Sequence, residues 1–213
     1  MELVLDWDGT VTEVDTLHAA IDEFGDVDVF RAMENEIGRR LTLQEVIAVE
    51  METITASLEE VVAFLVETVP LRSGFTEIVE RHGPLVVSMG FHELIAPLLV
   101  RDGVEVRVVA NRLDPQPAGW NALFRPQALC DVCGEPCKRS DLAGLDGFVY
   151  VGDGFSDRCV AQAARRVFAR DGLATYLAGK GVVFEGFDDF YDVASALDGG
   201  AVVPPTRSRG RKT

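Results

Sequence analysis

Short apolar runs recur along this chain and are separated by segments with the periodicity of helices. Several of the runs are apolar at consecutive positions, a pattern typical of parallel strands buried on both faces. Strands are predicted over five ranges: Glu2–Leu5, Pro84–Ser88, Val104–Ala110, Gly147–Asp153 and Arg166–Ala169. Residues 73–83, 91–103 and 156–166 have helical spacing, and the first two segments end in glycine. This alternation predicts an α/β fold with a doubly wound parallel sheet.

The segment from residue 13 to residue 72 interrupts the alternation, because it contains helical patterns and no convincing strand. Helices are predicted over residues 16–25, 27–40, 42–54 and 57–69. Thr42 and Ser57 are suitable N-caps, and Glu60 completes a capping box with Ser57. We therefore expect a helical insertion of about 60 residues between the first strand and the next helix of the core.

A second and smaller insertion is expected from Asn111 to Lys138. This stretch contains Pro115, Pro117 and Gly119, residue types that interrupt both helices and central strands. It is predicted to leave the sheet as a loop or a hairpin.

Composition and charge exclude several classes of protein. Hydrophobic residues make up 47% of the 213-residue chain, enough for a packed core, and the net charge is −15. Residues 204–213 are predicted to be a disordered basic tail. Without the four basic residues after position 206, the net charge of the chain is −19. Such an acidic body repels nucleic acid and anionic membranes. Asp6 and Asp8 interrupt any N-terminal signal, and no run approaches the roughly 18–20 apolar residues of a membrane span, so a cytoplasmic protein is expected.

Polar side chains follow the predicted strands at the points where the strands end. Asp6 and Asp8 follow the first strand, in the sequence DWDGT, and Ser88 ends the second strand. Asp153 and Asp157 follow a later strand, in the sequence GDGFSD, and Lys138 precedes that strand. Because ligands of open α/β sheets bind beyond the carboxyl ends of the strands, these side chains are expected to converge on one crevice.

Four carboxylates in one crevice need a cation to remain ionised. Oxygen ligands suit Mg²⁺, which binds one or two protein carboxylates together with a substrate phosphate. A carboxylate such as Asp6 can attack phosphorus, and Asp8 can exchange a proton with the leaving oxygen and then with water. Ser88, the N–H groups of the Gly9-Thr10 turn and those of the helix expected after Ser88 can bind phosphate oxygens. Lys138 adds positive charge against the transferred group.

The sequence DWDGT, Ser88, Lys138 and the sequence GDGFSD resemble, in order and spacing, the four motifs of the haloacid dehalogenase superfamily. The resemblance implies a Rossmann-like, three-layer α/β core with a helical cap inserted after the first strand. It also implies Mg²⁺-dependent phosphoryl transfer through an aspartyl-phosphate. The core is expected to comprise residues 1–13 and 73–203, and the cap residues 14–72.

The resemblance also assigns roles to individual residues. It makes Asp6 the nucleophile and Asp8 the general acid and base. The substrate and phosphate are expected to contact Thr10, Ser88, Met89, Gly90 and Lys138. The metal site is expected to involve Asp6, the main-chain oxygen of Asp8 and Asp153, with Asp157 holding the site from nearby.

Further stretches resemble one branch of the superfamily. The helical insertion and the sequence LRSGFTEIV, residues 71–79, are similar to the cap and its return to the core in phosphoserine-phosphatase-like proteins. The sequence CDVCGEPCK, which ends at Lys138, resembles a stretch of two subgroups, the methionine-salvage phosphatase for 2-hydroxy-3-keto-5-methylthiopentenyl 1-phosphate and the phosphoethanolamine/phosphocholine phosphatase. Two departures stand out: Met89 replaces a small residue, and Asp15 replaces the glutamate of phosphoserine phosphatases, which counts against phosphoserine as the substrate.

Cysteines are few in this chain, and in the cytosol they are expected to be reduced. Cys130, Cys133 and Cys137 have the spacing C-x2-C-x3-C, whereas structural zinc needs four ligands. Cys159 lies on a different segment, predicted to be a core helix. Reduced thiols in a loop near the site are therefore the favoured interpretation, with zinc as the alternative.

Four functions are compatible with this fold. The first is a small-molecule phosphomonoester hydrolase, and the second is a phosphotransferase or phosphomutase that passes the phosphoryl group to an acceptor hydroxyl. A dehalogenase is disfavoured by Asp8 and by the implied Mg²⁺, and a non-catalytic binding protein by the complete acidic set. A closed helical cap favours a small phosphorylated metabolite as the partner, since a protein or nucleic-acid chain would not fit beneath it. The oligomeric state stays open.

Overall fold

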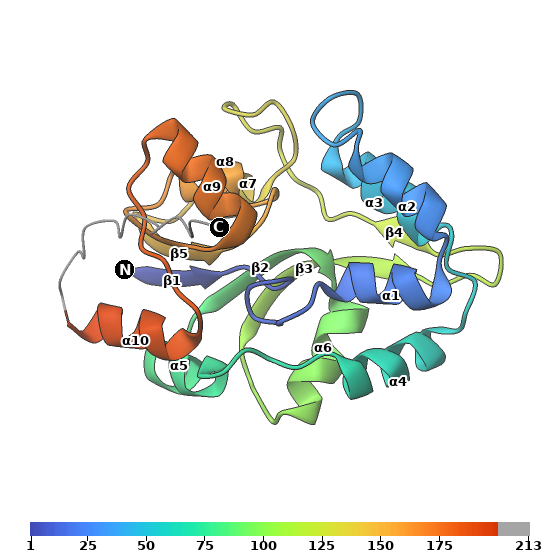
Figure 1. Cartoon of the computed structure of the whole chain (residues 1–213), viewed down its shortest axis with the longest axis horizontal. Coiled ribbons are helices and arrows are strands. Elements are labelled where there is room, and N and C mark those ends of the chain that lie inside the picture. The colour runs from blue at the N-terminus through green and yellow to red at the C-terminus, as the bar shows by residue number, and fades with distance from the viewer. Residues whose placement is uncertain (200–213) are drawn as a thin grey trace, which may run out of the picture.

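The computed structural model describes residues 1–199, and within them a twisted sheet runs through the middle of the molecule (Figure 1). Its strand order is β4-β3-β2-β1-β5-β6, and all neighbours are parallel except the pair β3 and β4. The strands are β1 (Glu2–Leu5), β2 (Leu85–Phe91), β3 (Arg107–Asp114), β4 (Asn121–Leu123), β5 (Phe148–Gly152) and β6 (Arg166–Ala169). The predicted tail, residues 204–213, lies outside the described residues.

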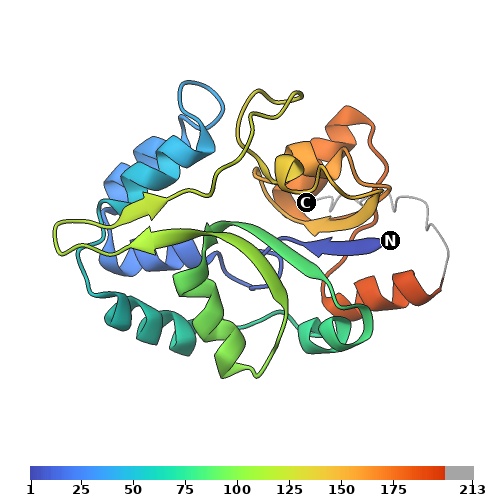
Figure 2. The ribbon, with the colours of Figure 1, turned by 180° about the vertical axis from the view of Figure 1, so that it is seen from behind.

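Helices cover both faces of the sheet. One face carries α5 (Phe75–His82), α6 (His92–Arg101) and α10 (Phe190–Asp198), and the other carries α7 (Lys138–Asp141), α8 (Arg158–Ala161) and α9 (Asp171–Lys180) (Figures 1 and 2). The side chains of β1 alternate accordingly, since Leu3 and Leu5 join the first apolar cluster and Val4 joins the second. The predicted three-layer α/β fold is confirmed.

The segment after β1 is helical, as predicted. It contains α1 (Thr16–Phe24), α2 (Val27–Glu34), α3 (Leu43–Met51) and α4 (Leu58–Thr68). Capping boxes at Thr42–Glu45 and Ser57–Glu60 begin α3 and α4. The second helix ends at Glu34 rather than near residue 40, because the chain turns back through Gly38 with a φ of 67°.

The helix α4 packs beside α6 of the sheet layer rather than beside the other inserted helices alone. Val61 and Leu65 of α4 share the first apolar cluster with Leu94 and Leu98 of α6. Arg101 at the end of α6 donates hydrogen bonds of 2.7 Å to two main-chain oxygens of residues 66 and 69. This contact fixes one end of the insertion to the core. The domain boundaries at residues 13–14 and 72–73 stay a prediction.

Strand boundaries near the carboxyl edge differ from the sequence prediction. The second strand continues to Phe91 instead of ending at Ser88, because a bulge between Val87 and Phe91 lets it resume pairing with β3. The helix α6 therefore starts at His92, four residues beyond Ser88. The helix predicted over 156–166 is reduced to the single turn of α8.

The second insertion is the predicted hairpin, formed by the end of β3 and by β4. It accounts for the later position of β3, which starts at Arg107 rather than Val104 and extends to Asp114. Trp120, next to β4, is completely buried and donates from Nε1 to the main-chain oxygen of Ala56 at 3.0 Å. The hairpin thus packs against the connection between α3 and α4.

None of the helices formed by residues 1–199 combines the length and the apolar composition required to cross a bilayer.

Candidate active site

The carboxyl end of β1 leads directly into a tight turn. The N–H of Asp6 still bonds to the oxygen of Val151 in β5 at 2.9 Å, so Asp6 is held at the edge of the sheet. Trp7 turns into the core, as predicted, and is completely buried. The N–H groups of residues 10, 11 and 12 all donate to the oxygen of Trp7 at 2.8–3.2 Å. This turn orients the remaining side chains of the motif.

Glycine is required at the centre of the turn because the loop after β5 approaches it closely. Gly9 has a φ of 72°, and a Cβ there would lie 2.4 Å from Oδ2 of Asp153. The adjacent Thr10 is buried and donates from Oγ1 to Oδ1 of Asp153 at 2.6 Å. The two acidic motifs predicted to converge are therefore in direct contact.

Lys138 lies between two of the predicted carboxylates. It is the first residue of α7, its side chain is buried, and its Nζ contacts Oδ1 of Asp6 and, at 2.7 Å, Oδ1 of Asp157. These two attractions raise the pKa of Lys138 although burial opposes them. The lysine therefore remains charged and joins the ends of β1 and β5.

Asp157 uses both carboxylate oxygens within the protein. Besides Lys138, Oδ1 accepts from the hydroxyl of Tyr150 at 2.6 Å, and Oδ2 accepts from the N–H groups of Asp153 and Gly154 at 2.9 Å. Burial would raise the pKa of Asp157, but Lys138 and these donors lower it. Asp157 is thus a fixed anion that shapes the 153–157 loop.

Asp8 and Ser88 face each other across the site. Oδ1 of Asp8 accepts from the N–H of Thr16 at 2.9 Å and from its hydroxyl, and Oδ2 lies 3.4 Å from Oγ of Ser88. The hydroxyl oxygen of Ser88 accepts from the N–H of Gly90 at 2.8 Å. Because α6 begins only at His92, the backbone donor beside Ser88 belongs to the bulged strand, which corrects the expected helix start.

The remaining carboxyl groups of the site hold protons more tightly than usual. Burial and the charge of Asp157 raise the pKa of Asp6 well above its ordinary value, with Lys138 opposing them. Burial, followed by Asp15, raises the pKa of Asp8 to about 6, and burial with Asp157 raises that of Asp153 to about 7. One buried lysine is therefore too little positive charge for this set of carboxylates.

The donor set fits a divalent cation. Carboxylate oxygens of Asp6, Asp153 and Asp157 lie within 4.8 Å of one another. Hydrogen bonds from the described residues fall on Oδ1 of Asp6 and on Oδ1 of Asp153, which leaves the second oxygen of each for a metal or a reactant. Hard oxygen ligands of this kind suit Mg²⁺.

A pocket of about 220 Å³ extends from these carboxylates toward the inserted helices. Near the sheet it is lined by Asp6, Asp8, Met89, Gly90 and Asp153, so Met89 does line the pocket. The opposite end combines apolar and acidic side chains: Leu17, Ile37, Leu43, Ile47, Phe155, Asp15, His18, Glu34 and Glu50.

The acidic groups at that far end differ in their partners. Asp15 is the N-cap of α1 and accepts from the N–H groups of Leu17 and His18. Glu50 is 3% exposed, and its Oε1 has no hydrogen-bond partner among residues 1–199. Burial, then Glu34 and Asp15, raises the pKa of Glu50 to about 8, so its carboxyl is protonated at neutral pH.

Arg72 supports the turn after β1 and was not identified from the sequence. Its guanidinium is buried and donates to the main-chain oxygens of Gly9, Thr10 and Thr12 at 2.8, 2.8 and 3.2 Å. Its position in LRSGFTEIV, directly before the core resumes, was the one available signal. An arginine there closes the insertion onto the turn after β1.

Arg125 and Asn111 support the Ser88 segment in the same way and were also missed. Arg125 donates to the main-chain oxygen of Ser88 at 3.0 Å, and Asn111 donates to that of Met89 at 2.7 Å. Arg125 also forms an ion pair with Asp141 of α7. Because these residues come from the hairpin, sequence spacing gave no indication of the contact.

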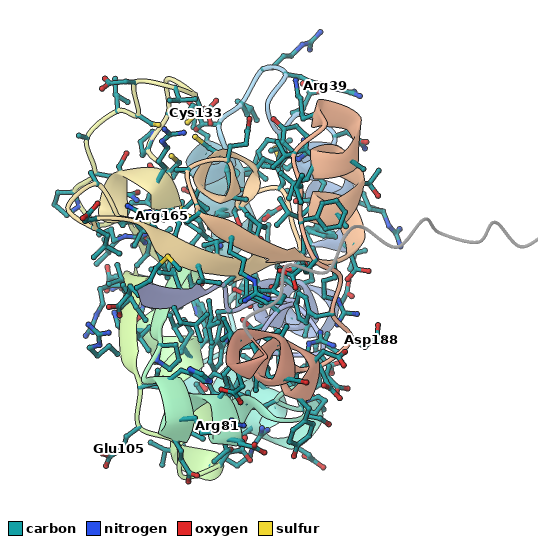
Figure 3. The ribbon with its side chains drawn as sticks, turned by 90° about the vertical axis from the view of Figure 1, so that its left-hand side faces the viewer. Arg39, Arg81, Glu105, Cys133, Arg165 and Asp188 are labelled. Atoms are coloured by element: carbon teal, nitrogen blue, oxygen red, sulfur yellow. The ribbon has the colours of Figure 1, made fainter. Side chains whose placement is uncertain are left out.

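Cysteines supply the main correction to the sequence prediction. Cys159 was set apart from the other three, but its sulfur lies 3.7 Å from that of Cys130. All four sulfur atoms lie within 4.8 Å of one another, because the short α8 brings Cys159 beside the 130–137 loop. Figure 3 shows Cys133 in the loop that lies beside the short helices.

Comparisons with known proteins agree with the fold. The profile of the haloacid dehalogenase-like hydrolases matches residues 3–162. A 2-hydroxy-3-keto-5-methylthiopentenyl-1-phosphate phosphatase of Geobacillus kaustophilus (strain HTA426) is 32% identical over 92% of this chain and 94% of its own. The protein of that name in Bacillus cereus (strain B4264) is 27% identical over 92% and 95%. A substrate-bound phosphoserine phosphatase structure aligns with a TM-score of 0.67 and 18% identity over 91% of this chain and 97% of that one.

Proposed function

This chain belongs to the haloacid dehalogenase-like hydrolases, and on that premise we propose that it is a Mg²⁺-dependent phosphatase of a small metabolite. The proposal rests chiefly on one observation: Asp6, buried at the end of β1, is held by Lys138 through one oxygen while its other oxygen is left for reaction. Such a carboxylate can serve as a nucleophile toward phosphorus and form an aspartyl-phosphate.

Two steps complete the reaction. In the first, the second oxygen of Asp6 attacks phosphorus, the bond from phosphorus to the ester oxygen breaks, and Asp8 gives its proton to the leaving alcohol. In the second, water attacks the aspartyl-phosphate, its proton passes to Asp8, and the bond to Asp6 breaks with release of inorganic phosphate. A pKa of Asp8 raised to about 6 suits a group that must both give and take a proton near neutral pH.

Phosphate is bound, in this proposal, by donors from two segments. Ser88 offers its hydroxyl, whose oxygen accepts from the N–H of Gly90, and Lys138 offers its charge, while Thr10 fixes Asp153 from the first turn. A Cβ at Gly90 would lie 2.9 Å from Oδ2 of Asp8 and would fill the space next to these donors. The phosphoryl group therefore has room between Asp6, Asp8 and Ser88.

Mg²⁺ would be held by the second oxygen of Asp153, by the main-chain oxygen of Asp8 and by Oδ1 of Asp6, which leaves the second oxygen of Asp6 for attack on phosphorus. Bound there, the ion supplies positive charge that lets an anionic nucleophile approach an anionic phosphate. Asp157, whose oxygens already have partners, orients Lys138 and the 153–154 backbone instead of binding the ion directly. This assigns metal binding to two side chains and a supporting role to the third.

The far end of the pocket favours a leaving group with an apolar part and neutral polar groups. Leu17, Leu43 and Ile47 supply an apolar wall, and the protonated Glu50 can both donate and accept a hydrogen bond. Asp15 accepts two hydrogen bonds from α1 on Oδ1, and its Oδ2 lies 3.7 Å from Nε2 of His18, so a free amine would compete with His18 for that oxygen. By likeness to the Geobacillus protein, 2-hydroxy-3-keto-5-methylthiopentenyl-1-phosphate is the leading candidate substrate.

Phosphate release from a panel of phosphomonoesters, with Mg²⁺ and with chelator, tests the proposal. The panel contains this candidate, phosphoserine, phosphoethanolamine, phosphocholine and sugar phosphates. We expect chelator-sensitive release, fastest for the candidate, and free phosphate as the product. Transfer of the phosphoryl group to an added hydroxyl acceptor, with little free phosphate, would favour a phosphotransferase instead.

Replacement of Asp8 gives a sharper test of mechanism. The variant Asp8→Asn should slow hydrolysis of an alkyl phosphate by about 10²–10⁴-fold. With p-nitrophenyl phosphate, whose leaving group needs no proton, phospho-enzyme formation should be nearly normal and its breakdown slow. The exposed Asp22 of α1 supplies a matched control, Asp22→Asn, which should behave as wild type. Equal slowing of both steps with both substrates would contradict the proton-transfer role.

A further inference from the structure

Four cysteine sulfur atoms form a compact group outside the pocket described above. The sulfur atoms of Cys130 and Cys159 lie 3.7 Å apart, and every pair among Cys130, Cys133, Cys137 and Cys159 lies within 4.8 Å. In a tetrahedral site with Zn–S bonds of about 2.3 Å, two sulfur atoms are about 3.8 Å apart. The group therefore has nearly the dimensions of a tetrathiolate cage.

The backbone around the group is folded as a metal-binding turn requires. Gly134, with a φ of 78°, directs its N–H to the oxygen of Cys130 at 2.8 Å and turns the chain back after Cys133. The N–H of Cys130 donates to the oxygen of Glu135 at 3.1 Å, which closes the same turn from its other end. The turn thereby holds the sulfur atoms of Cys130 and Cys133 in one group.

A second turn begins at Cys137. The N–H of Ser140 donates to the oxygen of Cys137 at 3.0 Å, much as that of Gly134 donates to the oxygen of Cys130. Two turns therefore each begin at a cysteine, and the fold brings the sulfur atoms of both cysteines into the same group.

A half-buried cation beside the group completes the observations. Arg158 precedes Cys159, and its Nε is buried without a hydrogen-bond partner among residues 1–199. Its side chain lines the same hollow as Cys133, Cys137 and Cys159, and its guanidinium lies over the rings of Phe155 and Tyr176. Four thiolates around one divalent cation carry a net charge of −2, so an occupied site would place negative charge beside this arginine.

We propose that Cys130, Cys133, Cys137 and Cys159 together bind one structural Zn²⁺ ion. Four protein sulfur ligands complete a tetrahedral shell and leave no position for substrate, which separates this site from the acidic one. Soft thiolate ligands also exclude Mg²⁺, so the two sites select different metals.

The location of the proposed ion gives it a positioning role. Cys137 directly precedes Lys138, and Cys159 follows Asp157 by two residues. An ion bound by both cysteines joins α7 to α8 and thereby holds the ion pair of Lys138 and Asp157, whose atoms are 2.7 Å apart. Zinc would therefore act on turnover through the placement of Lys138, without touching the substrate.

Metal analysis of the full chain, purified without chelator and dialysed, is the direct test. We expect about one zinc per chain in the wild type and in the control Val132→Ala, whose exposed side chain lies in the same turn. The variants Cys133→Ser and Cys159→Ser should retain less than about half of it. Cys133 is exposed, so its replacement should leave the fold intact, as circular dichroism can show.

Cobalt substitution of the wild type provides a second measurement that does not depend on variants. Co²⁺ bound by four thiolates in a tetrahedron gives intense visible bands and sulfur-to-cobalt charge transfer, which should be absent from Cys133→Ser. The proposal is overturned if the wild type takes up no zinc or cobalt, if it contains iron in place of zinc, or if the native protein has a Cys130–Cys159 disulfide.

Discussion

Two groups of like side chains, one of carboxylates and one of thiols, meet at the short helices α7 and α8, which begin after Cys137 and after Asp157. Asp6, Asp153 and Asp157 gather at the carboxyl edge of the sheet, and the four cysteines gather beyond it. The first group contains a buried cation, Lys138, which pairs with two of its members. For the thiol group, the corresponding positive charge would come from a bound metal.

This difference shows how each group is kept together. The carboxylates are attached to strands β1 and β5, whose register is fixed by main-chain pairing from Glu2–Phe148 to Leu5–Val151. The thiols are attached to a loop and to a single helical turn. Neither segment is part of the sheet that residues 1–199 form, so no strand pairing within it fixes the positions of the thiols. The acidic site should therefore persist without its metal, whereas the thiol site should loosen when its metal is removed.

The comparison predicts its largest effect for Asp6→Asn. This change removes the nucleophile but preserves the shape of the side chain, so we expect activity to fall by about 10⁴-fold or more. Zinc content should be unchanged, because Asp6 has no contact with the thiol group. The measurements are phosphate release and metal content, with Asp22→Asn as the control. Turnover within about tenfold of wild type would remove Asp6 from the role of nucleophile.

The next largest effect is expected for Lys138→Met, which should lower both the stability of the protein and its activity. The variant leaves Asp6 and Asp157 buried without their cation, and breaking a buried ion pair costs about 3–5 kcal/mol. Urea unfolding measures this loss, and the neighbouring Arg139→Met is a control that removes a positive charge outside the ion pair. A loss below about 1 kcal/mol would mean that the two carboxylates do not depend on Lys138.

Most of the acidic site could be predicted from the sequence, because it depends on topology. Once strands end at Asp6, Ser88 and Asp153, parallel pairing brings the ends to one edge. The supports Arg72 and Arg125 could not be predicted, since each reaches main-chain oxygens from a segment whose path the sequence leaves open. The extension of β2 beyond Ser88 depends on a bulge, and apolar patterning does not reveal bulges.

The thiol group shows the same limit more clearly. Three of its members are recognisable by spacing, but the fourth, Cys159, seemed to lie on a long core helix. In the structure that helix ends after one turn, and Asp157, which directly precedes it, bonds to the N–H groups of Asp153 and Gly154 in the loop before it. A residue of the acidic site thus holds the loop that leads to the fourth thiol.

Removal of the proposed zinc from the thiol group should have an intermediate effect on stability and should also lower the activity of the acidic site. At a zinc concentration 100-fold above Kd, loss of the ion costs about 2.7 kcal/mol of stability. We expect Cys159→Ser to lower Tm by several degrees and kcat more than KM for substrate, because Lys138 is displaced while the far end of the pocket is not. Added Mg²⁺ should not restore activity. An unchanged kcat in a zinc-free variant would show that the two groups are independent.

The smallest effect on turnover is expected at Glu50, a carboxyl that has neither a lysine nor a candidate metal beside it among residues 1–199. Its pKa of about 8 lies above the ordinary value of 4.5, mainly because of burial and then of Glu34 and Asp15. Between these pH values the folded protein holds more protons than the unfolded chain, so this group makes stability fall as pH rises. Its contribution is complete below pH 4.5 and is lost as pH passes 8.

Glu50→Gln should remove that pH dependence, because glutamine has nearly the same shape and cannot ionise. We expect nearly equal stability of the two proteins at pH 5, and an advantage of about 3–4 kcal/mol for the variant at pH 8. Urea unfolding at both pH values measures the difference, and the exposed Glu52 provides the control Glu52→Gln. If Glu50→Gln is instead destabilising at pH 8, the carboxylate has a cationic partner in the folded protein. The far end of the pocket would then bind a positively charged leaving group, just as the carboxylates of Asp6 and Asp157 bind the cation of Lys138.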